Sequence, residues 1–190
     1  MENKNRTRNR ILLALATIAV VIAVPLVYGS TLLTVNAQSG RPIDGAFAVT
    51  ATAIAGYTGP AYCGGTAYNV EVEAHGLGYT SLGAMSFSLI KTVQSPGPAM
   101  HGCLTLTAAN GDILYATYDG SEPNPPNAHG FRLSSGTLTF TGGTGRFSGA
   151  SGSATFTASF TRLGGSFTSS SPALISAYYL VHGNLIPHDR

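Results

Sequence analysis

The chain has 190 residues, of which only 9% are charged and 44% are hydrophobic, and it carries a formal net charge of +2. This length fits one domain, and the hydrophobic content is too high for a disordered chain. Four of the ten basic residues lie in the first ten positions, so the body from Gln38 onward is nearly neutral, with six basic and seven acidic residues. Such a body lacks the clustered Lys and Arg that bind a phosphate backbone, and nucleic-acid binding is not expected.

Residues 1–37 are typical of a targeting segment. The basic residues 1–10 precede an uncharged apolar run, and Val35 and Ala37 fit the −3 and −1 positions of a cleavage site before Gln38. Residues 11–35 carry no charge and are also long enough for a membrane-spanning helix. We therefore expect either a signal peptide cleaved near Ala37 or a retained signal anchor. In both cases the C-terminal domain, residues 38–190, is expected outside the cytoplasm.

Eight strand-like runs follow in this domain. Their residues alternate between apolar and polar, which is typical of half-buried strands, and Gly- or Pro-rich turns separate them. No run has a sustained helical period. The runs cover residues 46–54, 68–73, 79–93, 104–107, 113–118, 133–141, 154–160 and 177–186. We predict an all-β domain forming an antiparallel closed barrel of about eight strands, preceded by one N-terminal hydrophobic helix. A two-sheet β-sandwich is the alternative.

The pair Asn110-Gly111 lies between two of these runs. An Asn-Gly pair flanked by alternating residues is a strong hairpin signal, because a type I′ turn needs positive φ at both central residues. We predict a β-hairpin with a type I′ turn here.

A glycine-rich segment begins after the strand-like run at 133–141. It contains Gly142, Gly143, Gly145, Arg146 and Phe147. The glycines permit a tight turn or bulge, after which Phe147 re-enters the core. Arg146 is expected to project outward or to cap a barrel end. A phosphate-binding loop is not expected, because the glycine spacing differs from the dinucleotide fingerprint and a strand rather than a helix follows.

The same segment, Gly-Gly-Thr-Gly-Arg-Phe followed by Ser-Gly, resembles a signature of the allene oxide cyclase and dirigent superfamily of eight-stranded β-barrels. The resemblance covers roughly residues 65–183 and is greatest to uncharacterised exported bacterial members. It implies a barrel fold. It implies no activity, because the catalytic residues of the cyclase and dirigent enzymes cannot be matched to positions in this chain. Homo-oligomers are common in the superfamily, so the resemblance also implies self-association.

Cys63 and Cys103 are the two cysteines of the chain. In an exported protein they are expected to form a disulfide. Free thiols, or a metal pair completed by a histidine, are the alternatives. His101, His75, Glu71 and Glu73 lie near them in sequence, but their spacing does not force convergence on one point. We expect these residues to be structural or solvated, and we expect no metal or cofactor site.

These observations favour a non-enzymatic function. We expect an exported β-barrel of structural or small apolar ligand-binding character. The alternative is a barrel cyclase or isomerase that acts on an apolar substrate in the lumen. The two classes are distinguished by the barrel interior, because a lumen filled by side chains leaves no room for a substrate.

Overall fold

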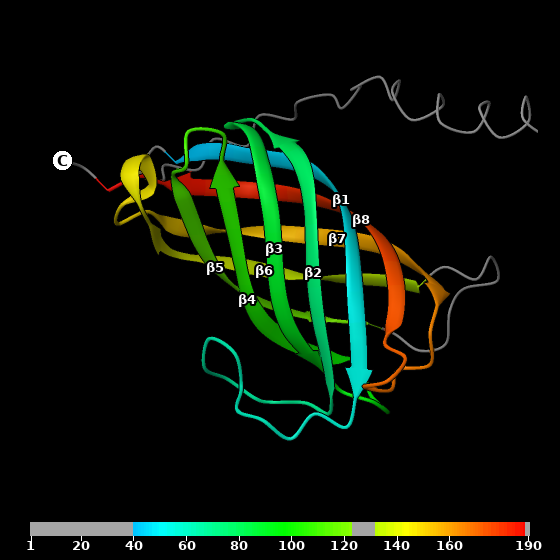
Figure 1. Cartoon of the computed structure of the whole chain (residues 1–190). Helices are drawn as coiled ribbons and strands as arrows, with labels where there is room; N and C mark the ends of the chain where they lie inside the picture. Colours follow the sequence, from blue (N-terminus) through cyan, green and yellow to red (C-terminus); the bar gives the residue numbers. More distant parts are fainter. Residues whose placement is uncertain (1–39, 123–131, 189–190) are drawn as a thin grey trace, which may run out of the picture. The chain divides into compact units, whose positions relative to one another are not determined.

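The computed structural model describes residues 40–122 and 132–188 and shows a closed barrel of eight antiparallel strands (Figure 1). Each strand pairs with the next along the chain, and β1 closes the barrel by pairing with β8. The strands are β1 (Arg41–Ala55), β2 (Val70–Thr80), β3 (Gly83–Val93), β4 (Ala99–Ala108), β5 (Ile113–Ser121), β6 (Arg132–Gly143), β7 (Ser151–Gly164) and β8 (Ala173–Ile186). The predicted closed barrel is confirmed, and the sandwich alternative is wrong.

The strands are longer than the alternating runs that predicted them. The run at 79–93 was predicted as one strand, whereas the structure divides it between the end of β2, a turn at Ser81-Leu82 and β3. Gly83 has a φ of 109° after this turn, a conformation that side chains with a Cβ rarely adopt. Tyr68 was predicted to be in a strand but precedes β2, where its N–H donates to Thr92 Oγ1.

The two ends of the barrel differ in their connections. The β2–β3, β4–β5 and β6–β7 connections lie at one end, here called the turn end. The β1–β2, β3–β4, β5–β6 and β7–β8 connections lie at the other end, here called the loop end. The long β1–β2 connection, residues 56–69, runs beside the barrel wall in Figure 1.

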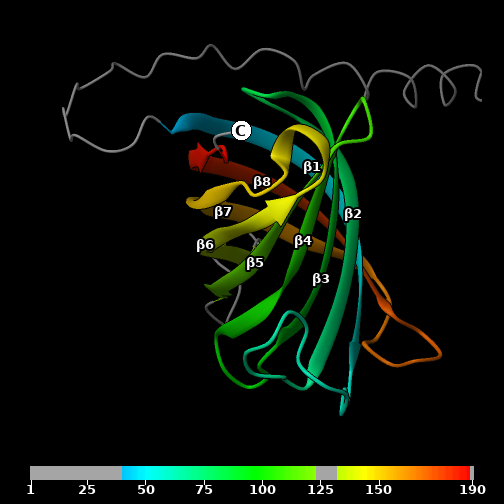
Figure 2. The same ribbon diagram turned by 90° about the vertical axis from the view of Figure 1, so that its left-hand side faces the viewer.

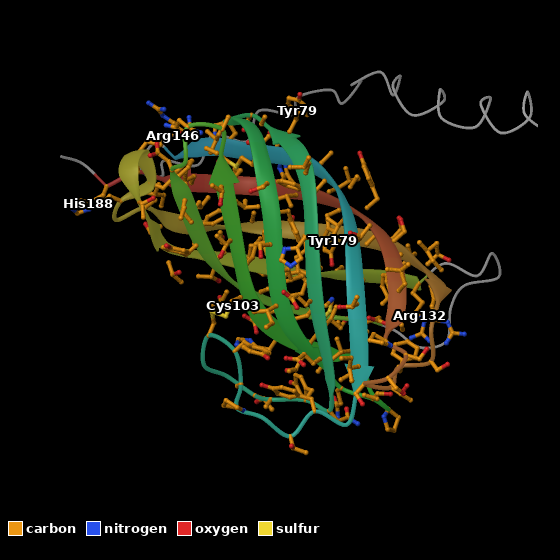
Figure 3. The ribbon with its side chains drawn as sticks, viewed as in Figure 1. Tyr79, Cys103, Arg132, Arg146, Tyr179 and His188 are labelled. Atoms are coloured by element: carbon orange, nitrogen blue, oxygen red, sulfur yellow. A yellow bond between two sulfur atoms is a disulfide. The ribbon has the colours of Figure 1, made fainter. Side chains whose placement is uncertain are left out.

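Side chains fill the interior of the barrel. Five aromatic rings, from β1, β3, β5, β7 and β8, contact one another across the lumen, with centroids 4.3–6.5 Å apart. Aromatic pairs at such distances contribute energy beyond the area that they bury. Tyr179, labelled in Figure 3, contacts three of the other rings. The rings belong to Phe47, Phe87, Tyr118, Phe156 and Tyr179.

The β4–β5 hairpin lies where Asn110-Gly111 predicted one, but its turn type is different. Gly111 has a φ of 87°, while positive φ at non-glycine residues of the described chain occurs only at Cys63 and Phe167. The N–H of Gly111 donates to the carbonyl of Ala108. The turn is therefore type I followed by a left-handed glycine, and the predicted type I′ turn is wrong. The loop is longer than the two-residue loop of a type I′ turn, so Asn110 does not need a positive φ.

The glycine-rich segment closes the turn end. Gly142 and Gly145 have positive φ, and a 3-10 turn, η1 (Gly145–Phe147), precedes β7 (Figure 2). Phe147 is buried beneath this turn. Arg146 donates from its guanidinium to the carbonyl of Leu82 and lies over the Phe147 ring, 4.7 Å from its centroid. The arginine therefore spans two connections of the same barrel end.

No helix within residues 40–122 and 132–188 is long and apolar enough to cross a membrane. The predicted targeting segment, residues 1–37, lies outside the described residues.

Candidate functional site

A polar cluster lies inside the barrel, near the loop end. Its centre is Lys91 of β3, which occupies an inward position after Met85, Phe87 and Leu89 and is only 5% exposed. The Lys91 ammonium lies 3.3 Å from the Met100 sulfur and 5.0 Å from the centroid of the Tyr118 ring. A thioether is a weak acceptor. The cation–π contact with Tyr118 is therefore the main stabilising contact of this charge among the described residues.

Tyr118 and Ser134 add hydroxyl groups to the cluster. Both side chains are buried, and neither hydroxyl makes a hydrogen bond of acceptable geometry within the described residues. Burial, and next the neighbouring phenol of Tyr179, raise the pKa of the Tyr118 phenol well above its usual range. Its hydroxyl therefore keeps its proton throughout the physiological pH range.

One buried carboxylate lies at this end of the barrel, but it already has a partner. The guanidinium of Arg132 donates to Glu122 Oε1 at 3.0 Å. Arg132 lies at the loop end in Figure 3. No carboxylate of the described residues lies within 4.0 Å of the Lys91 ammonium. Lys91 is therefore the buried charged group of this cluster that has no carboxylate partner among the described residues.

Glycines at inward positions make room for this cluster. Gly102 lies between Lys91 and Tyr118 in the register, and a Cβ there would come within 2.5 Å of Lys91 Cβ. A Cβ on Gly136 would come within 2.8 Å of the Phe156 ring, which stacks on Tyr118. The absence of side chains at these positions lets the lysine and the two rings approach one another.

The β1–β2 connection covers a second polar group on the outer wall. Cys63 in this connection forms a disulfide with Cys103 of β4, with a Cα–Cα distance of 5.5 Å, so the predicted pairing is confirmed (Figure 3). The neighbouring His101 donates from Nδ1 to Asp119 Oδ1. Its Nε2 is buried beneath Gly65, where a Cβ would lie 2.6 Å away. The disulfide therefore holds the connection over the histidine.

The remaining candidates from the sequence do not converge. Glu73 pairs with His75 at 3.1 Å on the exposed face of β2, whereas Glu71 accepts a hydrogen bond from the Tyr62 hydroxyl. Within residues 40–122 and 132–188, no group of three His, Cys, Asp or Glu side chains is arranged to hold a metal ion.

The outer surface carries an apolar band. It consists of two rows of outward residues that cross β6, β7, β8, β1 and β2 in register, and no Lys, Arg, Asp or Glu lies in either row. The first row is Leu133, Ser159, Tyr178, Ala48 and Leu77, and the second is Ser135, Thr157, Leu180, Ala46 and Tyr79. Its leucines and tyrosines are among the most exposed large apolar side chains of the described chain.

A groove of about 390 Å³ lies within this band. Outward side chains of Leu133, Tyr178 and Leu180 line it, together with Ser and Thr residues of β6 and β7. The groove therefore opens on the outer wall, at the part of the barrel that lacks charge.

Two of these features were not predicted from the sequence. Lys91 lies in an alternating strand whose neighbouring inward positions are apolar, and this position could have indicated a buried lysine. The sequence gives no such indication of the apolar band. Its residues come from five strands, and only the strand register shows that they are neighbours.

No known protein family matches the chain, and no curated protein is similar to it in sequence. Among solved structures, the chain is similar to the pterocarpan synthase dirigent protein GePTS1, with 16% identity, a TM-score of 0.35, and coverage of 83% of this chain and 99% of that chain. It is also similar to the pterocarpan synthase dirigent protein PsPTS1, with 14% identity, a TM-score of 0.34, and coverage of 77% and 98%. At these TM-scores, neither structure identifies a family or an activity for this chain.

Proposed function

We propose that this protein is a non-enzymatic structural barrel that acts through its outer wall, by association of copies of the chain along the apolar band. The band is the observation that carries the proposal. Exposed apolar patches of this kind mark interaction surfaces. A surface without charge also suits self-association, because two copies bring no like charges together.

The dimensions of the band support a contact between copies. Five strands at about 4.8 Å spacing give a width of about 24 Å. A standard interface buries ~800 Å² per partner, so a contact between copies would also include residues beside the two rows. Serine and threonine side chains between the leucines and tyrosines supply the hydrogen-bonding groups that such interfaces contain.

The filled interior favours this function over a luminal one. A small apolar ligand, or the substrate of a cyclase or isomerase, needs a cavity of about 300 Å³ or more. The ring cluster from Phe47 to Tyr179 occupies the middle of the lumen instead.

The proposed location is outside the cytoplasm. The Cys63–Cys103 disulfide supports it, because disulfides persist mainly in oxidising compartments. The targeting character of residues 1–37 supports the same location, either secreted or anchored at a membrane.

The substitution Leu180→Glu tests the function. Leu180 is half exposed at the centre of the band, so the change should alter the stability of a single barrel by only about 0.5 kcal/mol. In an assembly it would bury a charge, and we expect at least a tenfold loss of affinity between copies, or about 1.4 kcal/mol. Size-exclusion chromatography with light scattering measures the effect on the full chain.

Tyr115→Glu is the matched control. Tyr115 is an exposed aromatic residue on β5, outside the band, and this variant should keep the parent's assembly state. A parent that is monomeric at every concentration, or equal masses for the parent and Leu180→Glu, would contradict the proposed function.

A further inference from the structure

The Lys91 ammonium is buried, and no carboxylate of the described residues lies within 4.0 Å of it. Its described neighbours are a thioether and the face of a phenol ring, and neither carries a formal negative charge. Buried charges in proteins are ordinarily paired with an opposite charge, because removing an ion from water is unfavourable. Glu122 is the buried carboxylate at this end of the barrel that could pair with Lys91, but it already forms an ion pair with Arg132.

Two further donors lie in the same cluster. The Tyr118 ring lies beneath the ammonium, and the Ser134 hydroxyl is near enough to influence the Tyr118 phenol. Both hydroxyls are buried and neither makes a well-aligned hydrogen bond among the described residues, although the Ser134 and Tyr179 hydroxyls lie close enough to Tyr118 to interact with it. A charged donor and two neutral donors therefore share one end of the lumen. In proteins generally, buried polar groups such as these have hydrogen-bond partners.

We propose that the loop end of the barrel interior binds a small monoanion, a halide or a short carboxylate, on the Lys91 ammonium with the Tyr118 and Ser134 hydroxyls as further donors. The positive charge of Lys91 selects an anion, and one ammonium matches one negative charge. The apolar surroundings strengthen this attraction, because Coulomb interactions increase as the local dielectric falls.

The size of the occupant follows from the packing. The aromatic cluster leaves no room for a drug-sized ligand, whereas a halide or a formate needs a volume of the order of a water molecule, about 30 Å³. Met100 contacts the ammonium and is the adaptable member of the site, because its unbranched side chain can move to another rotamer. This small ligand is compatible with an otherwise filled barrel.

Thermal unfolding of the full chain in different sodium salts tests the site. Chloride, bromide, formate or acetate replaces gluconate at constant ionic strength, so that screening stays equal while the small anion varies. An anion that binds only the folded state raises Tm with its concentration. We expect a rise of several degrees for at least one small anion, and the halide and carboxylate series identify which class binds.

Three variants assign the effect to the cluster. Lys91→Met keeps the length and apolar stem of the side chain but removes the charge, and it should abolish the anion dependence. It should also leave the protein at least as stable in gluconate, because a buried charge without a partner is unfavourable. Arg41→Met is the control variant. It removes an exposed positive charge at the start of β1, at the turn end of the barrel, and should keep the full response. Tyr118→Phe retains the ring and should weaken the response at least threefold in midpoint concentration.

Each outcome decides the proposal. A parent whose Tm does not differ between gluconate and any small anion overturns it. So does a Lys91→Met protein that keeps the parent's response. If Lys91→Met fails to fold, Tyr118→Phe decides the question. An unchanged midpoint anion concentration in that variant would show that the Tyr118 hydroxyl does not bind the anion, and this would contradict the proposal.

Discussion

Gly111 illustrates how a single residue sets a connection of this barrel. Its φ of 87° lies in the left-handed region, and nothing lies within 4 Å of the position that a Cβ would take. The cost of a side chain here is therefore conformational rather than steric. The hairpin was evident from the Asn-Gly pair, but the turn type was not, because the number of residues in the loop depends on where the two strands stop pairing.

Gly111→Ala should lower the free energy of unfolding by about 1 kcal/mol, since alanine resists positive φ. Gly164→Ala is a matched control, because Gly164 is equally unobstructed but does not have positive φ. Chemical denaturation of both variants measures the difference. Equal stability of the two proteins would show that Gly111 is not held in the left-handed region.

At the scale of elements, the sequence pattern identified the strands well and their contacts poorly. Alternation within one strand indicates which side chains share a face, and Met85, Phe87 and Leu89 share the buried face of β3. It does not report which strands adjoin. Lys91 meets Tyr118 across Gly102 because of the register of β3, β4 and β5, and pairing between distant segments is not encoded in a local period.

The β1–β2 connection depends on its disulfide. The bond closes a loop of 40 residues, and in the chain-entropy model its loss destabilises the fold by roughly 3–4 kcal/mol. Thiol titration of the denatured, unreduced protein should find no free thiol, and the reduced protein should unfold at lower denaturant concentration. Two titratable thiols in the unreduced protein would contradict the pairing.

The β6–β7 connection depends on Gly145 rather than on Arg146. A Cβ at Gly145 would collide with the carboxylate of Asp112, and its φ of 53° also disfavours a β-branched residue. Gly145→Val should therefore reduce the thermal stability strongly, while Arg146→Ala should leave the fold intact with a loss of about 1 kcal/mol or less. Thermal melts compare the two variants. A larger loss in Arg146→Ala than in Gly145→Val would reverse this assignment.

At the scale of the whole molecule, the barrel separates a filled interior from an outer wall that carries little charge. The ring cluster and the inward leucines stabilise the closed sheet, and closure removes the strand edges that would otherwise pair with other chains. In the proposed assembly, the side chains of the outer wall make the contacts between copies. The composition is consistent with this arrangement, because only 9% of residues are charged and the outward positions of β6, β7 and β8 are mostly Ser, Thr, Leu and Tyr.

The most direct test of this account compares two tyrosines in one molecule. Tyr178 lies in the apolar band and is 45% exposed in the single barrel, while Tyr115 lies outside it and is 41% exposed. Oxidative footprinting of the full chain, read by mass spectrometry over a range of protein concentrations, reports the accessibility of both. Association along the band predicts that Tyr178 becomes protected as concentration rises, while Tyr115 stays accessible. Equal labelling of the two tyrosines at every concentration would contradict the account.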